Sequence, residues 1–153
     1  MKKTLSFLLA VLLLGAVLLS GCRSTEEYKE KYEAVDQKVR EYLDLMVQRD
    51  FDGMYAMLYP DVVSKEDYDA LTDRMTAYCP IREGYELNMQ TWDVYSRTDD
   101  GRDIVIITYE LRFDGELFYL NTRYVTEKDA EGFTNIQFVS KADYDAAAAQ
   151  SGK

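Results

Sequence analysis

The 153-residue chain contains no histidine. Histidine is the commonest general base at neutral pH and the commonest metal ligand, so its absence argues against most hydrolase triads and most metal centres. Basic residues are also scarce, because 18 lysines and arginines stand against 28 aspartates and glutamates, for a formal net charge of −10. This acidity argues against nucleic acid as a partner and against polybasic attachment to anionic lipid.

Cysteine occurs only twice, at Cys22 and Cys79, so the chain has no disulfide framework. Because Cys22 lies in a processing motif, Cys79 is left without an intramolecular partner. We interpret Cys79 as a small buried apolar residue and not as a reactive thiol, since no histidine is present to activate it.

A targeting segment opens the chain. Two lysines after the initiator methionine precede an apolar run over residues 5–19, shorter than the about 20 residues that span a bilayer. The run ends in the sequence Leu-Ser-Gly-Cys at 19–22, which resembles the lipobox of bacterial lipoproteins. The resemblance implies that residues 1–21 are cleaved as a signal peptide and that Cys22 carries fatty acyl groups such as palmitate. An uncleaved membrane helix is the alternative.

This processing would leave residues 22–25 as a short linker and would place the protein in a bacterial cell envelope. The lipid on Cys22 would anchor it to the membrane on the extracytoplasmic side, and two or three acyl chains suffice for a stable anchor.

Helical spacing of apolar residues dominates the first half of the remaining chain. Residues 28–47 carry an apolar stripe with charged residues opposite, which predicts one long amphipathic helix. Met54–Leu58 is typical of a short second helix that Pro60 stops. Ser64 begins an approximate capping box, so a third helix should follow and continue to Pro80.

From residue 85 onward the apolar period changes to two, and turn residues separate the alternating segments. This pattern predicts an antiparallel sheet of about four strands. The expected strands are roughly Tyr85–Arg97, Arg102–Phe113, Glu116–Glu127 and Phe133–Lys141.

Asp114 and Gly115 form the clearest turn signal, since a two-residue hairpin requires positive φ at both positions. The turn fixes a register in which one face of the second and third strands is apolar and should meet the helices. The opposite face is mixed, and it is either solvated or covered by a partner. The pairs expected on the apolar face are Phe113 with Glu116, Leu111 with Phe118, Tyr109 with Leu120, Ile107 with Thr122 and Val105 with Tyr124.

The C-terminal residues 143–153 have too few apolar side chains to pack. A flexible tail is therefore expected there, with a frayed helix as the alternative.

The order of elements over residues 26–142 resembles the nuclear transport factor two-like superfamily, also called the ketosteroid isomerase-like or cystatin-like α+β fold. Val47–Leu58 and Ser64–Tyr68 are similar to helical segments of small lipoproteins in this superfamily. The resemblance implies a cone-shaped half-barrel, in which a curved sheet wraps the long helix and a pocket opens at one end. The chain departs from the usual layout because no short strand is evident between the second and third helices.

Aromatic residues are the candidate ligand contacts. Thirteen tyrosines and one tryptophan are many for this length, and those lining the mouth of a cone would stack on an apolar or ring-bearing ligand. The alternative is that these rings are core and sheet residues. The four candidates are Tyr55, Trp92, Tyr109 and Tyr124.

No catalytic or metal-binding residue is assigned, and no cofactor is expected. Most aspartates fall in predicted turns or helix ends, where water keeps their chemistry ordinary. Residues 99–110 have the acidic ends of a calcium loop, but Gly101 stands where a ligand is needed and Ile104 where glycine is needed. A turn followed by a strand accounts for that segment.

These patterns favour a non-enzymatic, lipid-anchored module that binds a small ligand or a cell-envelope partner. Two alternatives stay open. One is a small isomerase or dehydratase with a tyrosine and a buried acid in its pocket. The other is an interaction protein that forms a homodimer through the outer face of the sheet.

Overall fold

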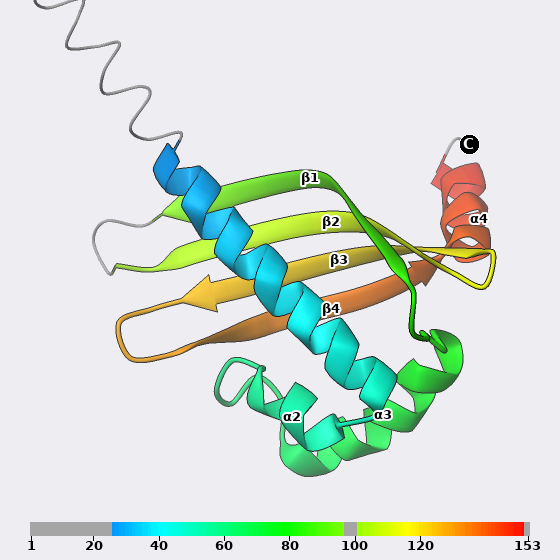
Figure 1. The fold of residues 1–153 in the computed structure, drawn as a ribbon, viewed down its shortest axis with the longest axis horizontal. Coiled ribbons are helices and arrows are strands. Elements are labelled where there is room, and N and C mark those ends of the chain that lie inside the picture. Colours follow the sequence, from blue (N-terminus) through cyan, green and yellow to red (C-terminus); the bar gives the residue numbers. More distant parts are fainter. Residues whose placement is uncertain (1–25, 97–100, 152–153) are drawn as a thin grey trace, which may run out of the picture.

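The computed structural model of the protein describes residues 26–96 and 101–151. It has an α+β fold, as the sequence predicts, with N-terminal helices packed against a four-strand antiparallel sheet and a helix at the C-terminal end. Figure 1 shows the long helix lying across one face of the sheet, with two shorter helices near its C-terminal end. The predicted signal peptide, Cys22 and the linker lie outside the described residues. Among the residues that are described, no helix has the length and apolar character needed to cross a membrane.

Three helices precede the sheet. Residues 26–48 are helical, followed by α2 (Phe51–Ala56) and α3 (Lys65–Tyr78). The predicted capping residue Ser64 accepts a hydrogen bond from the Asp67 amide over 3.1 Å and begins α3. The second helix starts earlier than the sequence pattern indicates, because Asp50 caps it.

The four strands follow in chain order as a meander. They are β1 (Glu86–Ser96), β2 (Asp103–Phe113), β3 (Glu116–Thr126) and β4 (Glu131–Ser140), and each pairs with its neighbours in sequence. Their bounds agree with the predicted ones to within two residues where the structure describes them, and Arg97 lies outside that part.

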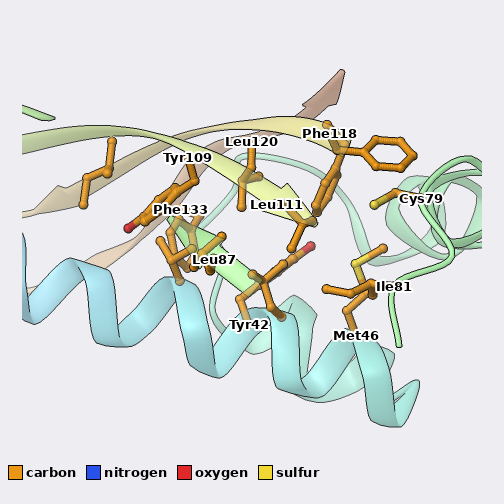
Figure 2. Packing of buried hydrophobic residues seen from close by; sticks show 14 of the residues in the cluster. Tyr42, Met46, Cys79, Ile81, Leu87, Tyr109, Leu111, Phe118, Leu120 and Phe133 are labelled. Atoms are coloured by element: carbon orange, nitrogen blue, oxygen red, sulfur yellow. The ribbon is translucent and has the colours of Figure 1, made fainter. Parts of the chain in front are cut away.

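The hairpin at Asp114 and Gly115 is confirmed. Both residues have positive φ, at 49° and 80°, and the predicted register between β2 and β3 holds along both strands. The apolar face of that hairpin is buried against the long helix, as predicted. Figure 2 shows the core formed there. Its members include Val39, Tyr42, Leu43 and Met46 from the helix and Ile107, Tyr109, Leu111 and Leu120 from the sheet.

Cys79 is fully buried in this core, in agreement with its interpretation as a small apolar residue. Burial raises the pKa of its thiol to about 12, and the charge of Glu116 acts in the same direction. A thiol held protonated at neutral pH is a poor nucleophile.

The C-terminal segment differs from the expected flexible tail, because residues Lys141–Ser151 form helix α4. Ser140 caps this helix: its hydroxyl oxygen accepts the Asp143 amide over 3.1 Å, and its hydroxyl donates to the Asp143 carboxylate over 2.8 Å. A run of alanines, the strongest helix formers, follows this cap. Tyr144 of α4 lies against Tyr119 on the outer face of the sheet, with ring centroids 4.6 Å apart.

A β-bridge joins the segment after α2 to the sheet, where the sequence indicates no strand. Leu58 pairs in parallel with Phe133 at the start of β4. The Tyr59 amide donates to the Phe133 carbonyl over 2.9 Å, and the Phe133 amide donates to the Met57 carbonyl over 3.0 Å. The bridge fixes α2 against the end of the sheet where β4 begins.

Candidate functional site

A cavity of about 360 Å³ lies between the first turns of the long helix and one end of the sheet. This is the end at which β2 begins, β3 ends and β4 begins, and in Figure 1 the blue start of the helix lies toward it. The floor is apolar and the rim is charged. The floor contains Ala34, Val35, Val105 and Tyr124, and the charged lining residues are Glu27, Glu30, Lys31, Lys38, Asp103 and Glu131.

Lys31 connects the two walls of this cavity. Its ammonium group lies 2.9 Å from a Glu27 carboxylate oxygen on the helix and 3.0 Å from Asp103 at the start of β2. It also donates to the Ser96 hydroxyl over 3.1 Å at the end of β1. Burial opposes the charge on Lys31, but the hydrogen bonds and charges of Glu27 and Asp103 outweigh it and raise its pKa. Lys31 therefore stays protonated and holds the helix to two strands.

Tyr124 forms the aromatic part of the floor. Only 5% of its surface is exposed, and its ring packs edge-on against Phe133 with centroids 4.9 Å apart. Burial raises the pKa of the phenol to about 12, and the charge of Glu131 and its hydrogen bond with the phenol add to the effect. The phenol thus stays neutral and links the floor to an acidic residue of the rim.

The other three predicted ligand contacts lie elsewhere. Tyr109 is fully buried, and Trp92 stacks on Tyr32 of the long helix with centroids 4.4 Å apart. Tyr55 donates through its hydroxyl to the Val63 carbonyl over 3.2 Å, beside α2. The structure therefore does not gather the four aromatics around one cavity, and a ligand-binding role for each of them stays a prediction.

The sequence pattern does not single out the charged residues of the rim. Glu27 and Lys31 are visible as an i,i+4 pair on the helix. Their meeting with Asp103, however, depends on how the helix docks on the sheet, and Glu131 depends on the turn between β3 and β4. Such contacts between distant segments carry no local signal.

A second cavity, of about 420 Å³, lies at the opposite end of the long helix. Arg49, Thr76, Arg82 and Asp114 are among its polar lining residues. Arg82 and Asp114 form an exposed ion pair with 3.1 Å between nitrogen and oxygen. The exposed lining of this second cavity is mostly polar, whereas that of the first is mostly apolar, so we place the candidate site at the first cavity.

Metal binding gains no support within residues 26–96 and 101–151, where no three acidic or cysteine side chains gather as ligands. The segment with the acidic ends of a calcium loop is strand β2 from Asp103 onward, and Asp99 lies outside the described part.

Comparison of the chain with models of protein families gives no match, and comparisons with curated proteins and with solved structures give none either. The architecture is therefore assigned as α+β, without a family.

Proposed function

We propose that this protein is a lipid-anchored module of a bacterial cell envelope that binds a small ligand or envelope partner on the extracytoplasmic side, without catalysing a reaction. The observation that carries the binding role is the cavity between helix and sheet, with an apolar floor and a charged rim. Concave sites of this kind, mostly apolar with a few convergent polar groups, are typical of small-molecule binding. The proposed location in the cell envelope is supported by the Leu-Ser-Gly-Cys motif at residues 19–22.

The fold proposed for the domain over residues 26–142 is the nuclear transport factor two-like half-barrel. The support is the order of elements, with helices first and a meander of four strands after them. Two irregularities in strand register, between Met89 and Thr91 and between Arg123 and Tyr124, are places where such strands bend. Fold likeness does not choose between binding and catalysis.

The carboxylates of the cavity favour binding over an isomerase or dehydratase. Such an enzyme needs an acid buried in an apolar site. The Glu27 side chain is 63% exposed and the Asp103 side chain is 26% exposed, and both pair with Lys31.

Homodimerisation through the outer face of the sheet has less room than the sequence implies. Helix α4 lies over one end of that face, where Tyr144 packs on Tyr119. A second copy would have to use the remaining part or displace the helix.

Mass spectrometry of the membrane-extracted protein tests the location. The expected product is a chain that begins at Cys22 and carries acyl groups. An intact N-terminal methionine or a free Cys22 thiol would contradict the anchor.

The binding role is tested on the full-length protein in phosphatidylcholine nanodiscs, with saturation-transfer NMR against water-soluble fragments that include 4-phenylbutanol. Ala34 lines the cavity from an exposed position on the helix, so Ala34→Trp fills the cavity without entering the core. Gln37→Trp is the matched control, because Gln37 is exposed on the same helix and outside the lining. We expect fragment binding that Ala34→Trp abolishes and Gln37→Trp preserves. Absence of any such binding contradicts the proposal.

A further inference from the structure

The rim of the first cavity carries more negative than positive side chains. Four carboxylates and two lysines line it, and both lysines are already paired. Lys31 lies within 3.0 Å of oxygens of Glu27 and Asp103, and Lys38 lies 3.5 Å from Glu41 on the exposed side of the helix. The cavity therefore offers an incoming ligand no uncommitted positive charge among its described lining residues.

Two carboxylates of the rim have no cationic partner. Within residues 26–96 and 101–151, neither Glu30 nor Glu131 forms an ion pair. Both are exposed, and both belong to the lining. Glu30 comes from the helix and Glu131 from the start of β4, so the negative charges lie on both walls. A positive group at the mouth would be attracted to each, while an anion would be repelled.

The floor below this rim would contact the apolar part of a ligand. Ala34, Val35 and Val105 present only hydrocarbon, and Tyr124 adds an aromatic ring that stays neutral. Burial of apolar ligand surface against such a floor is favourable. A hydrated inorganic cation could not use it. The combination therefore calls for a ligand with two parts, one apolar and one positive.

The position of the cavity along the chain indicates where such a ligand would be met. Glu27 follows Cys22 by five residues. Whatever their conformation, five residues span at most about 18 Å. A lipid on Cys22 would therefore keep the mouth close to the bilayer surface. Amphiphilic molecules gather at such a surface because their apolar parts are buried there.

We infer that the cavity binds an amphiphilic organic cation, with the apolar body on the floor formed by Val35, Val105 and Tyr124 and the positive group facing Glu30 and Glu131. This inference rests on the proposed function, because it names the ligand class of the same cavity.

The test uses three probes with the same apolar body and different charges: 4-phenylbutylammonium, 4-phenylbutanol and 4-phenylbutyrate. Dissociation constants are measured by NMR titration with the full-length protein in phosphatidylcholine nanodiscs, and empty nanodiscs supply the background. We expect the cation to bind about tenfold more tightly than the neutral alcohol, the gain that two exposed carboxylates can supply. The anion should bind most weakly, and added salt should reduce the differences.

The double variant Glu30→Gln/Glu131→Gln should remove the preference, so that the cation and the alcohol bind with similar dissociation constants, because it removes the two carboxylates of the rim that have no ion pair. The matched control is Glu66→Gln/Asp73→Asn, which removes two exposed carboxylates from α3 without touching the cavity lining. It should keep the preference.

Equal or tighter binding of the alcohol than of the cation, still abolished by Ala34→Trp, would overturn the inference and leave the proposed binding function standing. So would a cation preference that survives the double variant. If none of the three probes and none of the fragments binds, both the inferred ligand class and the proposed binding function are overturned.

Discussion

The hydroxyl of Tyr109 donates a hydrogen bond to Asp36 over 3.0 Å and so joins strand β2 to the long helix across 73 positions in the chain. Arg40 holds the same carboxylate, with 3.0 Å between its Nε and the other oxygen. Asp36 is thus a charged acceptor at the boundary between helix and sheet. Hydrogen bonds to charged acceptors contribute more than those between neutral groups.

Tyr109→Phe should lower the free energy of unfolding by about 2 kcal/mol, because it removes the hydrogen bond to a charged acceptor and keeps the ring. Urea denaturation at neutral pH measures the change. Asp36→Asn is the companion variant: an amide oxygen can still accept from Tyr109, and the ion pair with the partly exposed Arg40 that is also lost contributes little, so this variant should cost less. Unchanged stability of Tyr109→Phe would show that the bond contributes nothing in solution.

Alkaline pH should destabilise the protein through its buried tyrosines. Burial raises the pKa of Tyr42 and of Tyr109, with the charge of the neighbouring Tyr68 or Asp36 adding to it, and raises that of Tyr124 to about 12. A raised pKa means that the folded state holds the phenolic proton more firmly than the unfolded chain. The stabilisation is therefore complete below the unfolded value near 10 and is lost as the pH rises through the folded values.

For Tyr42 and Tyr109 the loss approaches about 1.4 kcal/mol for each, per pH unit above about 10. Urea denaturation at about pH 9 and about pH 11 measures it, and Tyr109→Phe should make the dependence shallower. A free energy of unfolding that is flat across this range would refute the burial of these hydroxyls.

Gly132 is the position at which a side chain would break the bridge between Leu58 and Phe133. A Cβ there would lie 2.4 Å from the backbone nitrogen of Tyr59 and 2.5 Å from the carbonyl carbon of Leu58. Backbone atoms cannot move aside as a flexible side chain can. Gly132→Ala should therefore cost about 3 kcal/mol, and it should abolish the protection of the Tyr59 amide against hydrogen exchange.

The control is Gly115→Ala at the hairpin turn. Its φ of 80° strains an alanine, but an added Cβ there meets no atom within 4 Å. It should cost about 1 kcal/mol and leave the Tyr59 amide protected. Equal protection of that amide in both variants would contradict the steric argument.

Tyr78→Phe should release α4 from the rest of the molecule. The Tyr78 hydroxyl accepts from the Ser140 amide over 2.9 Å and donates to the Asp143 carboxylate over 2.5 Å. Loss of these two hydrogen bonds should speed amide hydrogen exchange in Ala146–Ala149. The control is Tyr95→Phe, which changes an exposed tyrosine of β1 and should leave the exchange rate unaltered. If both variants exchange at the wild-type rate, Tyr78 does not hold the helix.

The same contacts make the start of α4 sensitive to acid. The hydrogen bond from Tyr78 and the one from Ser140 hold the pKa of Asp143 below its ordinary value. The cap should therefore be fully formed above the ordinary carboxyl range and should be lost as the pH falls through the lowered value.

Local chemistry accounts for what the sequence predicts well. Asp114 and Gly115 tolerate positive φ, so the turn and the whole register between β2 and β3 follow from two residues. Ser64 likewise marks the start of α3 through one side-chain hydrogen bond. Alternation then tells which face of the sheet is buried.

Most of the features that the sequence does not predict depend on contacts between distant segments. The bridge at Leu58 depends on how α2 docks beside β4. The alternation of apolar residues predicts the face of the sheet on which Tyr109 and Trp92 lie, but not which part of the long helix each of them contacts. Helix α4 is a different case, because its signal is local. Ser140 followed by Asp143 caps a segment that is too polar for a core and is nevertheless a good helix former.

The meander topology also bears on the order in which the helix and the strands pack during synthesis. Each strand pairs with the next one along the chain, so the sheet closes only short loops as it forms, which favours rapid folding. The long helix is synthesised before the sheet, and its apolar stripe from Val35 to Met46 packs against strands made tens of residues later. Until β2 and β3 are complete, the stripe lacks the part of the core that those strands supply. If the chain crossed a membrane during synthesis, this apolar stripe would emerge before the strands that bury it, and a holding chaperone could act on it there.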